Sequence, residues 1–188
     1  MNGQMEQRTC RICNEVKVLG QFEIDRRYKD GHFTSRCKAC KSATQSKAAR
    51  ALQHMREKAA KEGREVEVTL NEIETLFETF DSCAYCGKKQ SESDEVFHIE
   101  HIIPRSAGGA DTLSNLTVSC PEDNHKKGVK PIVAYFFENR ERMSDARFVL
   151  LAHYVSITSG QPVEDVAYDM ANQFADYEMQ KINADLSK

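Results

Sequence analysis

The chain has 188 residues, of which 40% are hydrophobic and 29% are charged, and its formal net charge is −3. This length allows one ordinary domain plus small accessory modules. It contains no apolar run long enough to span a bilayer, and no signal peptide precedes its first cysteines, so we expect an intracellular, cytoplasmic protein without a membrane partner.

The charge is unevenly distributed along the chain. Residues 1–64 hold 15 Lys and Arg against 7 Asp and Glu, whereas residues 65–188 hold 11 against 22. The overall charge therefore argues against a uniformly basic nucleic-acid binder. Any attraction to a phosphate backbone is expected in the first third of the chain.

The first third contains two Cys-x-x-Cys pairs separated by 23 residues, formed by Cys10, Cys13, Cys37 and Cys40. Tight turns at this spacing let two thiolates reach one tetrahedral ion, and two such turns complete a four-cysteine zinc site. A disulfide-linked secreted module is the alternative, but it would leave the chain's seventh cysteine unpaired.

The segments 21–24 and 29–34 suggest a hairpin between the two cysteine pairs, with its turn at 30–31. We therefore expect residues 1–41 to form a zinc ribbon or treble-clef module that is too small to be stable without its metal. Its basic residues are the expected DNA contacts: Arg26, Arg27, Lys29, Arg36, Lys38 and Lys41.

Residues 42–64 are rich in alanine and contain no proline or internal glycine, which predicts a basic linker helix. The helix either continues the DNA-binding surface or presents a solvated face. Further along, Thr69 and Glu72 have capping-box spacing, and an apolar stripe follows at Leu70, Ile73, Leu76, Phe77 and Phe80. This second helix is expected to pack in the core.

Residues 96–103 predict a strand, since they are rich in branched and aromatic side chains and are followed by Pro104 and a glycine turn at 107–110. Residues 115–120 predict the returning strand. Pro121, followed by two acidic residues, predicts the start of a short helix that carries Asn124.

Within this strand, strand, helix order, Glu100 and His101 stand next to each other. A neutral imidazole can deprotonate water, while Glu100 and Asn124 offer the hard oxygen ligands that a Mg²⁺-like ion prefers. Neighbouring residues of a strand point to opposite faces, so Glu100 and His101 can act together only if the strand twisted or ended there.

The region from Cys83 to Lys127 resembles the HNH (His-Asn-His) endonuclease family, a ββα fold around one metal. The resemblance implies that His101 is the general base and that Asn115 pins the hairpin loop. It also implies that Glu100 and Asn124 hold the catalytic metal, and that cleavage leaves 5′-phosphate and 3′-hydroxyl ends. Three further basic residues lie near this site and are expected to contact DNA: Arg105, Lys126 and Lys127.

Many members of this family brace the core with four cysteines around a structural zinc. Here three cysteines fit those positions and an acid takes the fourth, giving the set Cys83, Cys86, Cys120 and Asp123. Carboxylates can bind zinc, although Cys and His are the usual structural ligands. The alternatives are a zinc whose fourth ligand is His125 or His98, a metal-free hydrophobic brace, and a disulfide.

The last third predicts only helices: one from Pro131 to Met143, a second capped by Ser144 and ending near Gly160, and a third opened by Pro162 and reaching toward Asn183. Packing against the core is the default role for these helices. A dimer interface and a part in choosing the DNA site are the alternatives.

The sequence thus predicts an α+β protein with a zinc module at 1–41, a linker at 42–64, a ββα-metal nuclease core at 65–130 and a helical region at 131–188. The expected function is metal-dependent DNA cleavage with Mg²⁺ or a similar ion, plus zinc in the N-terminal module. The layout resembles a free-standing nuclease of a bacteriophage or mobile element. The alternatives are a non-catalytic zinc-dependent DNA-binding or regulatory protein with a decayed core, and an adaptor.

Overall fold

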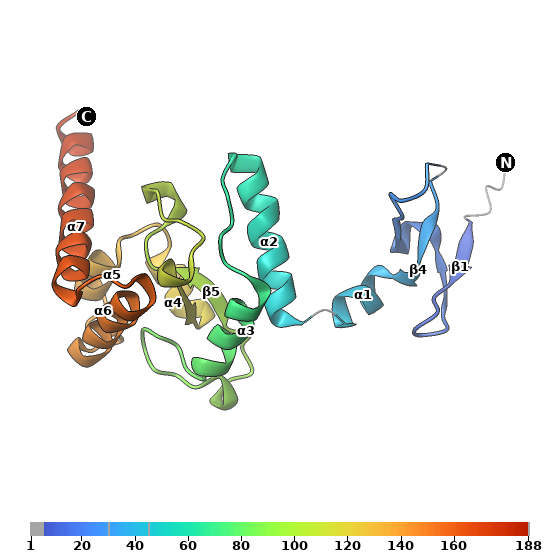
Figure 1. Cartoon of the computed structure of the whole chain (residues 1–188), viewed down its shortest axis with the longest axis horizontal. Helices are drawn as coiled ribbons and strands as arrows, with labels where there is room; N and C mark the ends of the chain where they lie inside the picture. The colour runs from blue at the N-terminus through green and yellow to red at the C-terminus, as the bar shows by residue number, and fades with distance from the viewer. Residues whose placement is uncertain (1–5, 30, 45, 188) are drawn as a thin grey trace. The chain divides into compact units, whose positions relative to one another are not determined.

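The computed structural model describes residues 6–29, 31–44 and 46–187, and it divides into two compact units on either side of the bond between Arg50 and Ala51 (Figure 1). The fold is mixed α+β. Within the described residues it contains three separate two-stranded antiparallel sheets. None of the helices described is both long and apolar enough to cross a membrane. The four-part functional division drawn from the sequence stays a prediction.

The first unit consists of two small hairpins and a helix: β1 (Gln7–Thr9), β2 (Val16–Val18), β3 (Phe22–Ile24), β4 (Phe33–Cys37) and α1 (Lys38–Thr44). Its buried centre is formed by Cys10, Phe22 and Cys37, with two further cysteines and Phe33 packed against it. This buried centre contains too little apolar surface to stabilise the first unit by itself. The hairpin expected between the cysteine pairs is present, although Asp30 of its predicted turn lies outside the described residues.

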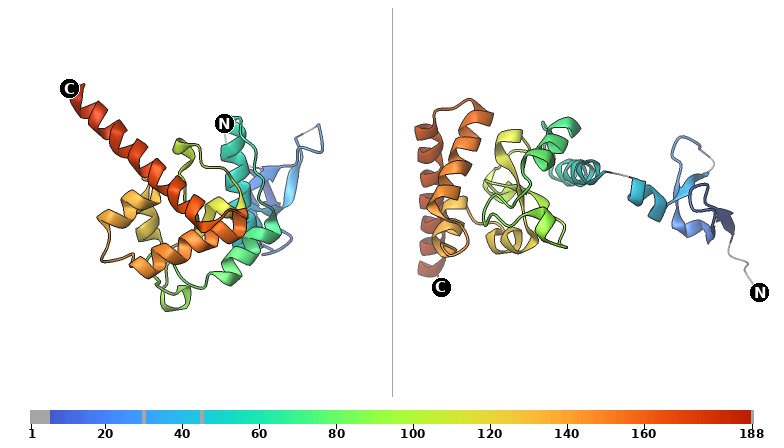
Figure 2. Two further views of the ribbon diagram at one scale, coloured as in Figure 1. Left: turned by 60° about the vertical axis from the view of Figure 1, so that its left-hand side comes forward. Right: turned by 90° about the horizontal axis from the view of Figure 1, so that it is seen from below.

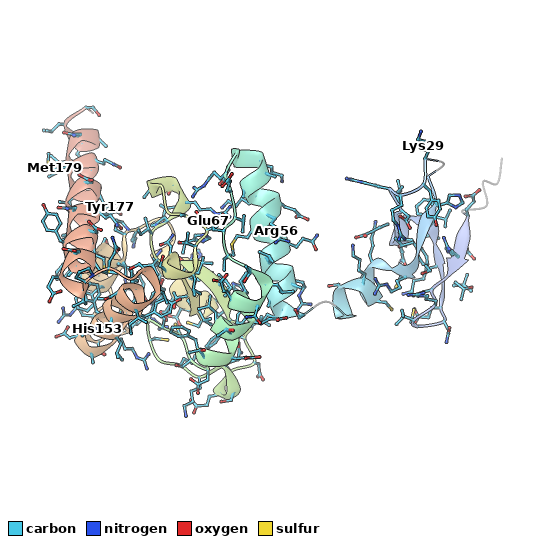
Figure 3. All side chains as sticks on the ribbon, in the orientation of Figure 1. Lys29, Arg56, Glu67, His153, Tyr177 and Met179 are labelled. Atoms are coloured by element: carbon cyan, nitrogen blue, oxygen red, sulfur yellow. The ribbon has the colours of Figure 1, made fainter. Side chains whose placement is uncertain are left out.

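Residues 42–64, which the sequence predicts as one basic linker helix, contain the end of one helix and the whole of a second. Helix α1 ends at Thr44 and α2 (Lys47–Glu62) begins at Lys47. Leu52, Met55 and Ala59 of α2 are buried, while Arg56 on another face is exposed and points into solvent (Figure 3). The basic face is thus the outer face of an amphipathic helix whose inner face packs within the second unit.

Helix α3 (Leu70–Thr79) begins with the expected capping box. The Thr69 hydroxyl accepts a hydrogen bond from the Glu72 backbone N–H, and the Glu72 carboxylate accepts one from the Thr69 N–H at 2.7 Å. These bonds satisfy backbone donors that a helix start leaves unpaired. Ile73 and Leu76 are buried, so the apolar stripe packs in the core as predicted.

The centre of the second unit is a ββα arrangement of β5 (His98–His101), β6 (Leu116–Ser119) and α4 (Pro121–Lys127). Glu100 pairs with Thr117 and His101 with Leu116 across the antiparallel hairpin. Pro121 is the first residue of α4, where its missing N–H costs nothing, and all four residues of β6 are buried. The strand, strand, helix order predicted from the sequence is confirmed.

Three helices complete the second unit: α5 (Ile132–Glu138), α6 (Asp145–Ser159) and α7 (Val163–Leu186). The predicted helix from Pro131 to Met143 was too long, because α5 ends at Glu138. Ser144 caps α6 and Gly160 ends it in the left-handed conformation, as expected.

Aromatic contacts hold these helices together. Phe136 of α5 stacks on Phe148 of α6 with ring centroids 4.6 Å apart, and Phe137 contacts Phe174 of α7. Helix α7 accordingly runs beside α5 and α6 (Figure 2). The Tyr154 hydroxyl oxygen lies 2.9 Å from the carbonyl oxygens of Leu113 and Leu116, and its single hydrogen is shared between these two acceptors, so α6 is anchored to the hairpin.

We expect Thr69→Ala to lower the free energy of unfolding of the second unit by about 1 kcal/mol, since the α3 capping bonds are lost. Thr69→Ser keeps the hydroxyl and should change it little. Urea unfolding followed by circular dichroism measures both, and equal losses for the two variants would contradict a role for the cap.

Candidate active site and cysteine clusters

Glu100 and His101 occupy the last two positions of β5 and line one hollow of about 480 Å³. The strand ends at His101, which is the geometric condition for the two neighbouring side chains to serve one site. The rest of the hollow is lined by residues of α2, the loop after β5 and the end of α4: Lys58, Glu62, Arg64, Pro104, Arg105, Ser106, Gly128 and Val129.

The His101 ring is held by a carboxylate that the sequence analysis did not single out. His101 Nε2 lies 2.5 Å from Asp111 Oδ1, and the Asp111 side chain is fully buried. Arg105 donates to both Asp111 oxygens, at 3.0 and 2.6 Å. A carboxylate bound in this way is an acceptor, so Nε2 carries the hydrogen and Nδ1 keeps the lone pair.

The electrostatic setting of His101 favours the neutral ring. Burial lowers the pKa of His101, while the neighbouring Asp111 opposes this by raising it. The net result is a lowered pKa, which leaves the imidazole able to accept a proton at neutral pH.

Asn115 fixes the loop that follows β5. Its side-chain oxygen accepts from the Ile103 N–H at 2.7 Å, and its amide nitrogen donates to the carbonyl oxygens of Ile103 and Ala110. Gly109 lies so close that a Cβ there would meet the Ile103 carbonyl oxygen at 1.9 Å. The loop carrying Arg105 and Asp111 is therefore held by backbone hydrogen bonds to one buried amide.

Glu100 is paired with Lys127 of α4. The Lys127 ammonium donates to Glu100 Oε1 at 2.9 Å and to the His101 carbonyl oxygen at 2.7 Å. Burial raises the pKa of Glu100 and lowers that of Lys127, and the attraction between the two opposes both shifts.

Two expected DNA contacts thus have other partners in the structure. The Lys127 side chain is fully buried against Glu100 and is not a surface clamp. Arg105 is 8% exposed, and its guanidinium is shared among Asp111, Glu62 and the Met55 carbonyl oxygen. Burial keeps the Lys127 charge from an external phosphate, whereas Arg105 lines the hollow and its contact with DNA stays a prediction.

Asn124 reaches the same hairpin from α4. Its side-chain nitrogen lies 3.4 Å from Nδ1 of the exposed His98, and Lys127 one turn later contacts Glu100. His98 and Glu100 are two residues apart and share the strand face that meets α4. Glu100 lines the hollow, whereas Asn124 is not among its lining residues, so the joint binding of a divalent cation by these two oxygen donors stays a prediction.

The four N-terminal cysteines lie together, with their sulfur atoms all within 4.8 Å of one another. The Cys37 N–H donates to Cys10 Sγ at 3.3 Å, and this bond is the largest of those that lower the pKa of Cys10 to about 6. None of the cysteines forms a disulfide in the part of the chain described. In the same cluster the pKa of Cys40 is raised to about 12, first by its hydrogen bond with Cys37, so it is the ligand type and spacing that allow the cluster to bind zinc.

In the core, the group assembled is Cys83, Cys86, Cys120 and Asp123, also with ligand atoms within 4.8 Å of one another. Asp123 Oδ2 lies 3.1 Å from Cys83 Sγ and 3.2 Å from Cys120 Sγ. Neither His98 nor His125 joins this group among the described residues. Cys86 Sγ and Cys120 Sγ are 3.9 Å apart. Zinc bound tetrahedrally to sulfur at about 2.3 Å would place two sulfurs about 3.8 Å apart, so the spacing fits.

Asp123 is further held by two residues from the segment after α4. Its Oδ1 accepts from the Tyr135 hydroxyl at 2.9 Å and from Arg142 Nε. Burial alone would raise the pKa of Asp123, but the hydrogen bonds from Arg142 and the thiols hold it well below its usual range. Three thiolates and a carboxylate carry more negative charge than one zinc ion can neutralise, and the positive charge of Arg142 offsets part of the excess negative charge.

Of the residues that the sequence analysis missed, only Asp111 carried a usable signal, because it directly follows the glycine turn of the loop. Arg142 and Tyr135 lie 19 and 12 residues after Asp123 and follow no motif. Of the expected DNA contacts in the first unit, Lys38 donates to the Gly20 carbonyl oxygen and Lys41 pairs with Glu23. Arg27 pairs with Asp25, and Lys29 lies at the tip of the β3 to β4 loop (Figure 3).

We expect the purified protein to hold two zinc ions per chain and Asp123→Ala to hold one, because the core would lose its fourth ligand. Asp123→Cys restores a four-thiolate set and should hold two. Glu122→Ala removes the neighbouring acid as a control and should also hold two. Elemental metal analysis gives the counts, and two ions in Asp123→Ala would rule out Asp123 as a ligand.

Comparison with known proteins identifies the core. Residues 83–130 match the family model described as HNH endonuclease. The Type IV methyl-directed restriction enzyme EcoKMcrA of Escherichia coli (strain K12) is 30% identical over 69 residues, which cover 32% of this chain and 25% of that protein. This chain thus spans a quarter of the length of that relative.

Among solved structures, the Type II-C Cas9 enzyme from Actinomyces naeslundii aligns with 75% of this chain and 14% of its own, at a TM-score of 0.37 and 16% identity. That likeness is too low to support an argument. The family match and the ββα arrangement agree with each other, and residues 83–130 of this chain form a domain of the HNH endonuclease family.

Proposed function

We propose that the protein is a metal-dependent DNA endonuclease with His101 as its general base. The observation that carries this proposal is the position of His101 and Glu100 at the end of β5, where both line one hollow of the HNH-family domain. A base beside a hard oxygen ligand is the pair that phosphodiester hydrolysis requires.

The orientation of His101 defines the proton's path. Asp111 accepts from Nε2, so Nδ1 is the nitrogen that takes a proton from the attacking water. The water oxygen bonds to phosphorus as the bond between phosphorus and the 3′ oxygen breaks, leaving a 5′-phosphate and a 3′-hydroxyl. Asp111 acts through His101 and is a positioning residue.

Glu100 and Asn124 are the residues that would hold the catalytic ion. A divalent cation of the Mg²⁺ type bound there supplies positive charge that stabilises the phosphate and the departing 3′ oxygen. Lys127 holds the Glu100 carboxylate in place, and its buried ammonium opposes the rise in the pKa of Glu100 that burial causes.

The basic first unit is the proposed DNA-binding part. Its lysines and arginines supply the attraction to the phosphate backbone that the acidic remainder of the chain lacks. The internal pairs of Lys38, Lys41 and Arg27 take part of that charge. Arg26, Lys29 and Arg36, all exposed, are therefore the stronger candidates for contacts with DNA.

We expect His101→Ala to slow cleavage of supercoiled plasmid with Mg²⁺ by about 10² to 10⁴-fold, the usual contribution of a general base. His153→Ala, which removes an exposed histidine of α6 (Figure 3), is the matched control and should cleave normally. The enzyme proposal fails if the unaltered protein leaves the plasmid intact in every divalent metal tried, or if His101→Ala cleaves as fast as the control.

We expect Asp111→Asn to lower kcat by about 10 to 100-fold, as is usual for a group that orients a histidine through its second nitrogen. If Asp111 only stabilised the fold, its replacement would not change which nitrogen of the His101 ring carries the hydrogen. ¹⁵N NMR of His101 should therefore report a protonated Nε2 in the unaltered protein and a mixture of tautomers in the variant. An unchanged tautomer would show that Asp111 does not orient the base.

A further inference from the structure

A second hollow, of about 510 Å³, lies in the first unit, and four arginines line it: Arg8, Arg11, Arg27 and Arg36. They come from β1, the first cysteine turn, the end of the β3 segment and β4. Among the other lining residues, Asp25 is the one carboxylate, so the hollow is strongly positive. Its volume falls in the range of about 300 to 1,000 Å³ that is typical of small-ligand pockets.

Two of the four arginines are occupied. Arg27 forms a two-pronged pair with Asp25, at 2.8 and 2.6 Å, and Arg8 donates to the Phe33 carbonyl oxygen. The guanidinium groups of Arg11 and Arg36 are exposed, and no side-chain partner is found for them among the described residues. They are the cations left to meet an external anion, and a guanidinium matches phosphate well.

The cysteine cluster brings these two arginines together. Arg11 directly follows Cys10 and Arg36 directly precedes Cys37, and the Cys37 N–H donates to Cys10 Sγ at 3.3 Å. The Arg11 N–H also donates to the Ser35 carbonyl oxygen at 3.0 Å, which joins the first cysteine turn to β4. The spacing of the two guanidinium groups therefore depends on an intact cluster.

The hollow also presents an aromatic surface. Tyr28 is 56% exposed, and its ring meets the His32 ring edge-on with centroids 5.1 Å apart. A paired duplex offers phosphates on a convex surface and keeps its bases stacked inside. An unstacked base instead needs a recess and an aromatic face, and charged groups beside an aromatic are typical of proteins that bind such bases.

We propose that this hollow binds one unstacked nucleotide of a DNA strand, with its phosphate on Arg11 and Arg36 and its base against Tyr28. The inference rests on the proposed action on DNA and adds a preference for DNA with an unpaired nucleotide. It also makes the N-terminal cysteine cluster a requirement for DNA binding, since the cluster spaces the two arginines.

The test uses the full chain with His101→Ala, so that DNA is bound without being cut. Affinity for a duplex with one bulged nucleotide is compared with affinity for the same duplex without the bulge, over a series of salt concentrations. We expect tighter binding to the bulged duplex. Equal affinity for the two duplexes would overturn the proposal.

Arg11→Gln with Arg36→Gln should weaken binding to the bulged duplex and make the slope of log Kd against log salt shallower by about 1. Arg11→Lys with Arg36→Lys keeps the charge and should retain most of the slope. Lys88→Gln with Lys89→Gln removes two exposed charges of the second unit as a matched control and should change neither quantity. Zinc content identifies any variant that has lost its fold.

Tyr28→Ala should weaken binding to the bulged duplex about tenfold without changing the salt slope, whereas Tyr28→Phe should bind normally. An unchanged slope in the Arg11 and Arg36 double variant overturns the phosphate assignment, and unchanged affinity in Tyr28→Ala overturns the base assignment. A phosphopeptide that competes as well as bulged DNA would also overturn the proposal. Cleavage is measured separately, with the unaltered protein. Selective binding to the bulged duplex without cleavage would refute the nuclease proposal and leave the nucleotide-binding proposal standing.

Discussion

The buried carboxylate of Asp111 is the contact on which the geometry of the candidate active site depends. Its two oxygens bind His101 at the end of β5 and Arg105 in the loop, while its backbone carbonyl accepts from Glu67 and Val68 ahead of α3. One residue thereby joins the hairpin, its loop and the segment before α3. A fully buried charge must be paired in this way, since an unpaired one would be very costly.

The core cysteine cluster joins the hairpin to the C-terminal helices in a similar way, since a buried carboxylate there also has partners from separate segments. Asp123 belongs to the cluster through one oxygen and to Tyr135 and Arg142 through the other. The acid in the fourth position of the cluster therefore has a positive charge beside it. The helical region after residue 130 is in part the structure that makes an acidic position in the cluster electrostatically tolerable.

The sequence predicted well wherever a local rule applies. The capping box at Thr69, the proline start of α4, the cap at Ser144 and the hairpin around Glu100 all involve residues near each other in the chain. It predicted less well where the burial of a charged side chain decides its partner. Arg105 and Lys127 look like phosphate contacts in the sequence, yet folding buries both against carboxylates that lie 6 and 27 residues away.

The sequence by itself determined the residue types and spacings of the HNH core and of the two cysteine groups, because metal ligation and a short ββα unit restrict both. Only the tertiary structure decided which carboxylate holds His101, that Asp123 joins the core thiols, and which arginines line the hollow of the first unit. Those outcomes depend on which charges become buried together, and burial is a property of the packed chain that no local pattern records.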